Sequence, residues 1–344
     1  MRSLRFFKGS FIVTLIGAAG GYYFGGFEAL FLIFVLSVLE ISLSFDNAVV
    51  NATVLKNMDA IWRKRFLTWG ILISVFGMRV IFPVAVVAIV AGVSPWSAIQ
   101  IAIDSPSHYQ ILMQSAHISL MGFGGSFLLL VGLDFFLNED KKEHWISVIE
   151  RPLLYIGKLK FSAEIFTVLG ILLIAGFYLP ESDQYSFIAS GACGIVAFTL
   201  IHKIASQMEK KEENRMAQNA TAAVAKSSLG MFLYLELLDA SFSFDGVIGA
   251  FAITTNLLII ATGLGIGAMF VRSLTIMLVE NNTLEEYRYL QHGAFYAVIA
   301  LAIIMFLKTF IHVPEIVTGL IGAGFISVAF IHSLAISHLK SKHK

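Results

Sequence analysis

The chain has 344 residues, of which 57% are apolar and only 14% are charged, and its formal net charge is +1. Together with a mean hydropathy of +0.81, this composition excludes an ordinary soluble domain, and the near-neutral charge gives no indication of a nucleic-acid partner. The single cysteine, Cys193, permits neither an internal disulfide nor a cysteine metal cluster. The sequence therefore predicts an integral membrane protein, with the lipid bilayer as its main partner.

Apolar runs long enough to cross a bilayer about 30 Å thick predict ten membrane spans. They cover residues 6–24, 27–55, 66–91, 117–137, 161–179, 185–204, 229–254, 257–279, 291–311 and 314–338. The expected fold is an all-α, polytopic transmembrane helix bundle that forms one domain over residues 1–344, with a cytoplasmic linker at 205–228. A cleaved signal peptide is the alternative for the first run, although no clear A-x-A site follows it.

The distribution of basic residues predicts the topology. If the N-terminus is cytoplasmic, all but three of the 24 Lys and Arg residues fall in inside segments. The exceptions are Lys308, in an outside segment, and Arg79 and Arg272, within spans. By the positive-inside rule we expect both termini to be cytoplasmic, in the cell inner (cytoplasmic) membrane.

The second span contains the stretch LEISLSFDNAVV, residues 39–50, which carries Glu40, Asp46 and Asn47. A carboxylate at the centre of a membrane helix costs roughly 3 kcal/mol, so these acids are expected to have a function. On an unbroken helix, Glu40, Ser44, Asn47 and Asn51 form one polar stripe, but Asp46 lies about 240° away from Glu40. Either the helix is unwound at S-F-D, or Glu40 and Asp46 serve different neighbours.

An internal repeat links this stretch to LLDASFSFDGVIGAF, residues 237–251. The acid, two serines and the F-D step recur at the same spacing, and each motif is followed by a span in which a glycine stands nine residues before an arginine. The aligned pairs are Glu40 with Asp239, Ser42 with Ser241, Ser44 with Ser243, Asp46 with Asp245, Gly70 with Gly263, and Arg79 with Arg272.

The predicted topology makes the two copies run in opposite directions across the membrane. The span with Asp46 descends to the inside, whereas the span with Asp245 ascends from it. We therefore expect two inverted five-span repeats, at about 6–179 and 185–338. Secondary transporters commonly have this architecture, with a site at the midplane where the repeats meet.

Oxygen atoms dominate the polar groups of the two motifs, and neither Cys nor His lies near them. Carboxylate, amide and hydroxyl oxygens suit hard cations such as Mg²⁺, Ca²⁺ and Mn²⁺ better than Zn²⁺ or Cu²⁺. We expect Arg79 and Arg272 to be counter-ions, and pure pairing of the acids with these arginines is the alternative to metal binding. Additional ligands or path residues are expected among Ser42, Ser44, Glu236, Ser241, Ser243 and Asp134, the last being either an interfacial residue or part of an exit path.

The paired acidic motifs, E-x5-D-N and D-x5-D, each followed by a span with G-x8-R, resemble the TerC family of integral membrane proteins linked to tellurium resistance. The long central insert and the stretch HGAFYAVIALAIIM, residues 292–305, are similar to its larger bacterial branch. The resemblance implies export of a divalent cation, chiefly Mn²⁺, with Ca²⁺ or Mg²⁺ as other candidates, and it implies a metal site made of Glu40, Asp46, Asn47, Asp239 and Asp245. Gly246 departs from the pattern, because the first repeat has Asn47 there.

Two other functions compete with transport. An intramembrane aspartic protease would use two of the aspartates, but it explains neither Glu40 nor Asn47, and the G-x-G-D signature is missing from the sequence. A membrane scaffold for a stress-response complex would leave the acids unexplained. The glycine runs at 122–125 and 263–267 predict close helix packing. We expect a non-enzymatic metal transporter, with inward proton movement as a coupling reaction.

Overall fold

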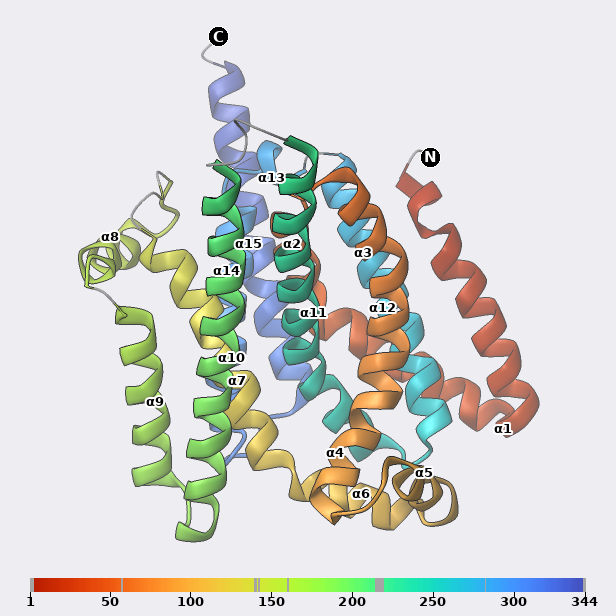
Figure 1. Cartoon of the computed structure of the whole chain (residues 1–344). Helices are drawn as coiled ribbons and strands as arrows, with labels where there is room; N and C mark the ends of the chain where they lie inside the picture. The colour runs from red at the N-terminus through yellow and green to blue at the C-terminus, as the bar shows by residue number, and fades with distance from the viewer. Residues whose placement is uncertain are drawn as a thin grey trace.

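The computed structural model describes residues 3–56, 58–138, 141, 143–159, 161–213, 220–281 and 283–342, and within these ranges every regular element is a helix (Figure 1). The prediction of an all-α fold is confirmed. After a short 3₁₀ turn, η1 (Ser3–Phe7), the helices are α1 (Lys8–Leu43), α2 (Phe45–Leu55), α3 (Ala60–Leu72), the π-helix η2 (Ile73–Ile81), α4 (Phe82–Ala91), α5 (Pro95–Asp104), α6 (Pro106–Ser115), α7 (His117–Leu137), α8 (Ser147–Gly157), α9 (Ser162–Tyr178), α10 (Glu181–Glu213), α11 (Ala220–Ile253), α12 (Leu257–Glu280), α13 (Thr283–Glu286), α14 (Leu290–Leu307) and α15 (Glu315–Lys342).

Six of the described helices are long and apolar enough to cross a membrane, or up to eight if each of two bent helix pairs counts as one span. The chain is thus a helical protein with several helices that could span a membrane. Each of the ten predicted ranges falls on helix, but the span count of ten remains a prediction. Four helices between the runs were not predicted from the sequence: α5, α6, α8 and α13.

The bends have local causes. Gly92 ends α4 with φ 63°, a left-handed conformation that glycine adopts without strain, and Pro95 starts α5 at a bend of 102°. Within α1, Gly26 has φ 65° and breaks the helix between the first two predicted runs. Figure 1 shows the two halves of α1 running in different directions on either side of this turn. The boundary predicted between residues 24 and 27 therefore lies at a glycine hinge.

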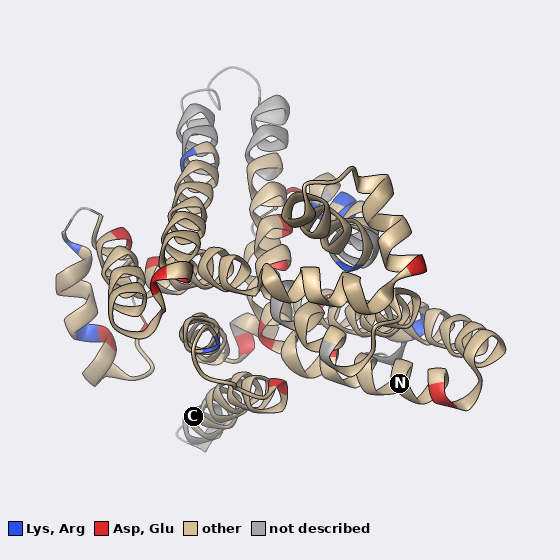
Figure 2. Cartoon of the chain, turned by 90° about the horizontal axis from the view of Figure 1, so that it is seen from below, with Lys and Arg blue, Asp and Glu red and all other residues tan. Residues whose placement is uncertain are grey.

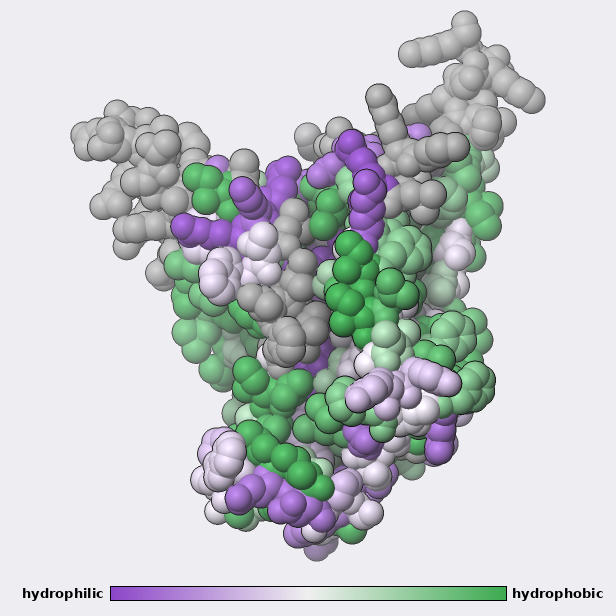
Figure 3. Space-filling view, turned by 90° about the vertical axis from the view of Figure 1, so that its right-hand side faces the viewer, coloured by the Kyte–Doolittle hydropathy of each residue, from purple (hydrophilic) through white to green (hydrophobic). Residues whose placement is uncertain are grey.

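Hydrophobic side chains cover the outer faces of the bundle. Leu15, Phe24 and Ile89 are between 74% and 88% exposed, which suits contact with lipid rather than water. Figure 2 shows that charged residues are sparse along the ribbons, and on the face shown in Figure 3 the hydrophilic residues gather toward the upper and lower edges. Both ends of the described chain lie at the same end of the bundle (Figure 1), as two termini on one membrane side require.

Glycines allow the central helices to pack closely, as the two glycine runs predicted. A Cβ on Gly263 would come within 2.6 Å of Leu36, and one on Gly267 within 2.5 Å of the Glu40 side chain, so α12 lies directly against α1. On α7, a Cβ on Gly125 would come within 2.6 Å of the Phe306 ring of α14. The linker predicted at 205–228 contains the end of α10 and the start of α11, and its side chains lie outside the described residues.

Candidate functional site

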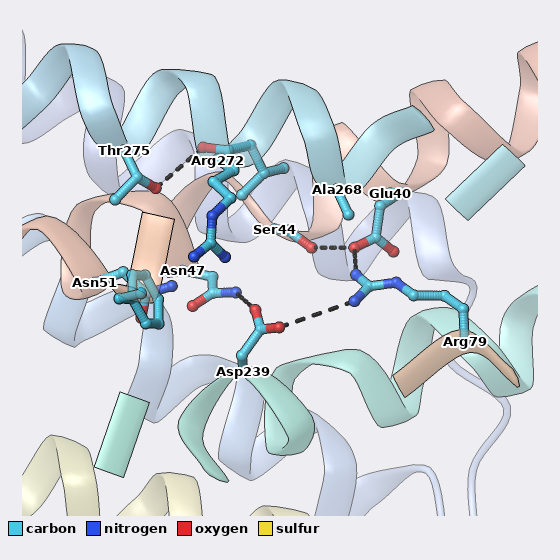
Figure 4. A pocket seen from close by; sticks show the side chains of 11 residues that line it. Glu40, Ser44, Asn47, Asn51, Arg79, Asp239, Ala268, Arg272 and Thr275 are labelled. Atoms are coloured by element: carbon cyan, nitrogen blue, oxygen red, sulfur yellow. Dashed lines mark hydrogen bonds and ion pairs between the residues drawn. The ribbon is translucent and has the colours of Figure 1, made fainter. Parts of the chain in front are cut away.

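A small polar cavity lies inside the apolar bundle, and we call it the central pocket (Figure 4). Its volume of about 20 Å³ provides room for about one water molecule or a dehydrated ion. Residues from α1, α2, α3, η2, α11 and α12 line it: Glu40, Ser44, Asn47, Asn51, Phe66, Arg79, Asp239, Ala268, Val271, Arg272 and Thr275. The two sequence motifs therefore meet at one place.

The first motif contains a helix break, as one of the two alternatives predicted. Helix α1 ends at Leu43 and α2 begins at Phe45, with Ser44 between them at φ −108° and ψ 15°. The Ser44 hydroxyl donates a hydrogen bond of 3.0 Å to Glu40 Oε1. The second motif has no such break, because α11 runs as one helix from Ala220 to Ile253. The break in the first motif is a kink at one residue, because the Ser44 N–H still donates to Glu40 O at 3.0 Å and Ser44 O accepts from the Ala48 N–H at 3.2 Å. The unwinding predicted at S-F-D is therefore limited to Ser44 in this conformation.

Arg79 joins the acids of the two motifs. Its Nη2 pairs with Glu40 Oε1, and its Nη1 lies 3.8 Å from Asp239 Oδ2. The side chains of Glu40 and Arg79 are each only 2% exposed. Asn47 Nδ2 completes the link by donating to Asp239 Oδ1 at 2.7 Å. Arg79 lies in the π-helix η2, a type of irregular turn that is frequent at functional sites. In Figure 4 its guanidinium lies between Glu40 and Asp239, so it acts as a counter-ion here.

Arg272 borders the pocket differently. Its guanidinium lies 4.2 Å from the centre of the Phe66 ring, and among the described residues its Nε and Nη2 have no hydrogen-bond acceptor. Gly70 makes room for it, because a Cβ at that position would lie 2.5 Å from Glu236 Oε1 and 2.6 Å from Arg272 Nη2. Arg272 and Glu236 therefore approach the same point above Gly70, on the edge of the central pocket.

Two amide oxygens of α2 remain available in the pocket. Asn47 and Asn51 are one helical turn apart, and the Oδ1 atom of each is buried without a hydrogen-bond donor among the described residues. Buried polar atoms are nearly always paired, so these oxygens are expected to bind water or a cation. Together with Glu40 and Asp239 they form a set of hard oxygen ligands.

Asp46 lies apart from this set. Its carboxylate is buried, it accepts a hydrogen bond of 3.0 Å from the backbone N–H of Asn47, and its Oδ2 faces α15, 3.7 Å from where a Cβ on Gly322 would lie. It does not line the central pocket. Glu40 and Asp46 therefore have different neighbours, which was the second of the two alternatives predicted for the first motif. The side chain of Asp245 lies outside the described residues, so its predicted meeting with Asp46 stays a prediction.

The remaining predicted residues have local roles in this conformation. The hydroxyls of Ser42 and Ser241 donate to backbone carbonyls one turn earlier in their own helices. Ser243 is buried, and Asp134 is exposed near the end of α7. Gly246 lies against Glu40, because a Cβ there would be 3.1 Å from Glu40 Oε2. Among the described residues, no group of three or more His, Cys, Asp or Glu side chains is arranged to hold a metal ion.

A second polar cluster, which the sequence analysis did not single out, surrounds Glu150 of α8. This carboxylate is fully buried, and it accepts hydrogen bonds from Lys141 Nζ at 2.9 Å, from the backbone N–H groups of Trp145 and Ile146 at 3.1 Å, and from Tyr296 at 3.3 Å. Burial lowers the pKa of Lys141, against the hydrogen bond to Glu150, which raises it. His292 Nε2 lies 3.6 Å from Glu150 Oε2. In the sequence, His292 and Tyr296 are spaced by one helical turn and so share a helix face, and this spacing was the signal that could have indicated the cluster. The cluster fastens the segment between α7 and α8 to α14.

The family comparison covers most of the chain. Residues 45–340 match the model of the family described as "Protein of unknown function (DUF475)". No curated protein and no solved structure matches. The matched region begins at Phe45, just after the helix break, and contains Asp46, Arg79 and the whole second motif. Because the match extends over far more than half of the sequence, the chain belongs to the DUF475 family.

Proposed function

We propose that this protein transports divalent metal cations across the cell inner membrane, chiefly Mn²⁺ out of the cytoplasm, with protons moving inward. Such export would contribute to resistance against metal stress, and the TerC resemblance extends this to tellurite. The observation that carries the proposal is the central pocket, where oxygens of Glu40, Asn47, Asn51 and Asp239 come together inside an apolar bundle. Neither Cys nor His is among the described residues that line it, which favours a hard cation.

The energetics support a charged cargo. An isolated carboxylate within a membrane span costs roughly 3 kcal/mol, and Glu40, Glu236 and Asp239 all lie at or near the pocket. Arg79 and Arg272 supply two positive charges against these three acids. A protein that needed only stability would be served as well by apolar side chains of similar volume. A bound cation that replaces the arginines during transport better explains why five ionisable groups lie at or near the central pocket.

Contacts between the two repeats support an inverted architecture. Asn47 of the first repeat binds Asp239, and Gly246, the residue aligned with Asn47, lies against Glu40, the residue aligned with Asp239. Likewise Gly70 lies against Glu236, while its partner Gly263 accepts a hydrogen bond of 3.0 Å from Ser37, the residue aligned with Glu236. Such reciprocal contacts are expected where two inverted repeats meet around a pseudo-two-fold axis.

Arg79 has a defined part in this mechanism. With its guanidinium between Glu40 and Asp239, Arg79 offsets part of their negative charge in the absence of cargo. A cation that enters the pocket must displace Arg79 from at least one carboxylate, so metal binding and movement of η2 are coupled. The π-helical geometry of η2 offers a way to move the side chain, because a shift to α-helical hydrogen bonding would rotate residue 79.

Cellular metal content tests the proposal. Cells that overexpress the protein should contain less Mn²⁺ after Mn²⁺ challenge than cells without it, whereas Glu40→Gln and Asp239→Asn should abolish the difference at equal protein level. Glu28→Gln is the matched control, because Glu28 lies on the same helix α1 but is exposed. Parallel measurement of Ca, Mg and Zn gives the selectivity. If both pocket variants behaved like the wild type, the scaffold function would be favoured.

A further inference from the structure

A larger cavity of about 550 Å³ lies between α2, α12, α13, α14 and α15, and we call it the α13 cavity. Its polar rim includes Asn281, Thr283 and Glu286, at the end of the bundle where both termini lie. Phe45, Ile326 and Phe330 are among its apolar walls. The lining thus extends from one acid, Glu286, near that end of the bundle to Phe45 beside the break in the first motif, and we call Phe45 the floor of the cavity.

Helices α2 and α12 form a wall between this cavity and the central pocket. On α2, Asn47 and Asn51 face the pocket, whereas Phe45 and Val49 face the cavity. On α12, Arg272 and Thr275 line the pocket, while Leu274 and Leu278 line the cavity. A movement of either helix would therefore change both spaces together.

Asp46 lies directly beyond the floor of the cavity. On α2 it follows Phe45, which lines the cavity. On α15, Ile326 lines the cavity, and Gly322, one helical turn earlier, lies against Asp46 Oδ2. Two independent elements thus lead from the cavity to the same carboxylate.

The other end of the α15 face is closed. Gly319 lies against the backbone carbonyl of Ser42, and Glu315 lies over Gly249 of α11, where a Cβ would be 2.6 Å from Glu315 Cγ. Lys308 Nζ is 3.5 Å from Glu315 Oε1, and the lysine side chain is only 5% exposed. An ion pair therefore occupies the far end of the face that begins at the α13 cavity.

We propose that the α13 cavity is the vestibule through which a hydrated divalent cation reaches Asp46 from the side of the termini, with Phe45 as its closed floor. Its lining contains an acid at the rim and leads to an acid at the floor, and no Lys or Arg lines it within the part of the chain that the structure describes. A lipid head group would be expected to meet a basic side chain. Apolar constrictions that close by losing water are a known form of gate. This inference rests on the proposed function and adds the direction of access.

Cysteine accessibility tests the vestibule. In a Cys193→Ser background, which removes the sole cysteine, Ser327→Cys places a thiol on the cavity wall. Val328→Cys is the matched control, because Ser327 and Val328 are neighbouring residues of α15 that are both exposed, but only Ser327 lines the cavity. A cationic, membrane-impermeant thiol reagent should modify Ser327→Cys from the side of the termini. It should modify Val328→Cys about tenfold more slowly, because an apolar environment suppresses the reactive thiolate.

Mn²⁺ supplies the decisive readout. It should slow modification of Ser327→Cys, and adding Asp46→Asn should remove this protection. Equal reactivity at both positions, or protection by added phospholipid rather than by Mn²⁺, would overturn the vestibule. Mn²⁺ flux in the same Cys193→Ser vesicles separates this inference from the proposed function. Flux without protection would refute the vestibule alone, whereas protection without flux would refute transport and leave a cation-accessible cavity.

Discussion

The central pocket and the α13 cavity share two walls, yet they have opposite chemistry. Helices α2 and α12 turn amide, hydroxyl and guanidinium groups to the pocket, and aromatic and aliphatic groups to the cavity. The pocket has a volume of about 20 Å³ and the cavity about 550 Å³. The comparison shows that one pair of helices presents a polar face to a small pocket and an apolar face to a larger cavity, and under our proposals the pocket would hold the cation and the cavity would admit it. The following substitutions are arranged to break or sharpen that distinction.

Substitution of Arg79 should have the largest effect on stability. Arg79→Met would leave Glu40 and Asp239 buried without their shared cation, and breaking a buried ion pair by removing one partner typically costs about 3–5 kcal/mol. Denaturant unfolding of the purified protein in detergent would measure the loss. If the pocket holds a cation, Mn²⁺ should restore part of the stability of Arg79→Met. Wild-type stability of this variant would show that the acids do not depend on Arg79.

Gly70→Ala should damage the edge of the pocket. The new Cβ would lie within 2.6 Å of both Glu236 Oε1 and Arg272 Nη2. Because both atoms end flexible side chains that can shift, we expect a cost at the lower end of the about 1–3 kcal/mol typical of overpacking. Gly176→Ala in α9 is the control, since no atom lies within 4 Å of its Cβ position. Thermal unfolding of both variants measures the difference. Equal melting temperatures would mean that Glu236 and Arg272 move aside freely.

At the far end of the α15 face, Lys308→Met should cost about 1–2 kcal/mol, between the values for exposed and buried ion pairs. The lysine is 5% exposed and Glu315 is 25% exposed. If the pair closes the path, Lys308→Met should also speed Mn²⁺ exchange across vesicles, and the double exchange Lys308→Glu with Glu315→Lys should restore the slow rate. A loss of stability without any change in exchange would identify the pair as a structural clasp only.

Much of the fold could be predicted from sequence, because long apolar runs and small residues act locally. The hinge at Gly26 and the contacts of Gly263 and Gly267 are such cases. The α4–α5 bend and helices α5, α6, α8 and α13 were missed, because short helices with mixed polarity give no long apolar run. The Glu150 cluster was missed as well, since its partners come from two segments far apart in the sequence, the α7–α8 connection and α14.

The sequence predicted which residues belong to the candidate site better than it predicted which of them lie close together. The repeat identified Glu40, Asn47, Asp239 and the two arginines, and all five line the central pocket. The separation of Asp46 from Glu40 depends on how far the helix turns at Ser44, which spacing alone leaves open. The polar stripe of the first motif placed Asn51 on the face that lines the pocket, although Asn51 was not named as a ligand. Phe66 was not predicted, because it is apolar and lies outside the repeated motif.

Ser44→Ala and Ser42→Ala give the smallest and most selective comparison. Both serines were candidate ligands, but Ser44 Oγ donates to Glu40 Oε1 at 3.0 Å inside the pocket, whereas Ser42 Oγ is exposed and bonded to Val38 O at 2.8 Å. Loss of one buried hydrogen bond to a charged acceptor should cost about 1.5–3 kcal/mol if nothing replaces it. The cost is smaller if water takes the place of the hydroxyl, because the net value of an ordinary hydrogen bond is about 1 kcal/mol. We therefore expect Ser44→Ala to lower stability by about 1 kcal/mol and Ser42→Ala to leave it unchanged.

The Mn²⁺ concentration that gives half-maximal thermal stabilisation adds a second readout. If Ser44 is a ligand, its substitution should raise that concentration; if it only orients Glu40, replacing it with threonine should preserve the wild-type value. An equal effect of both alanine substitutions would contradict the division of the first motif into a pocket face and an outer face.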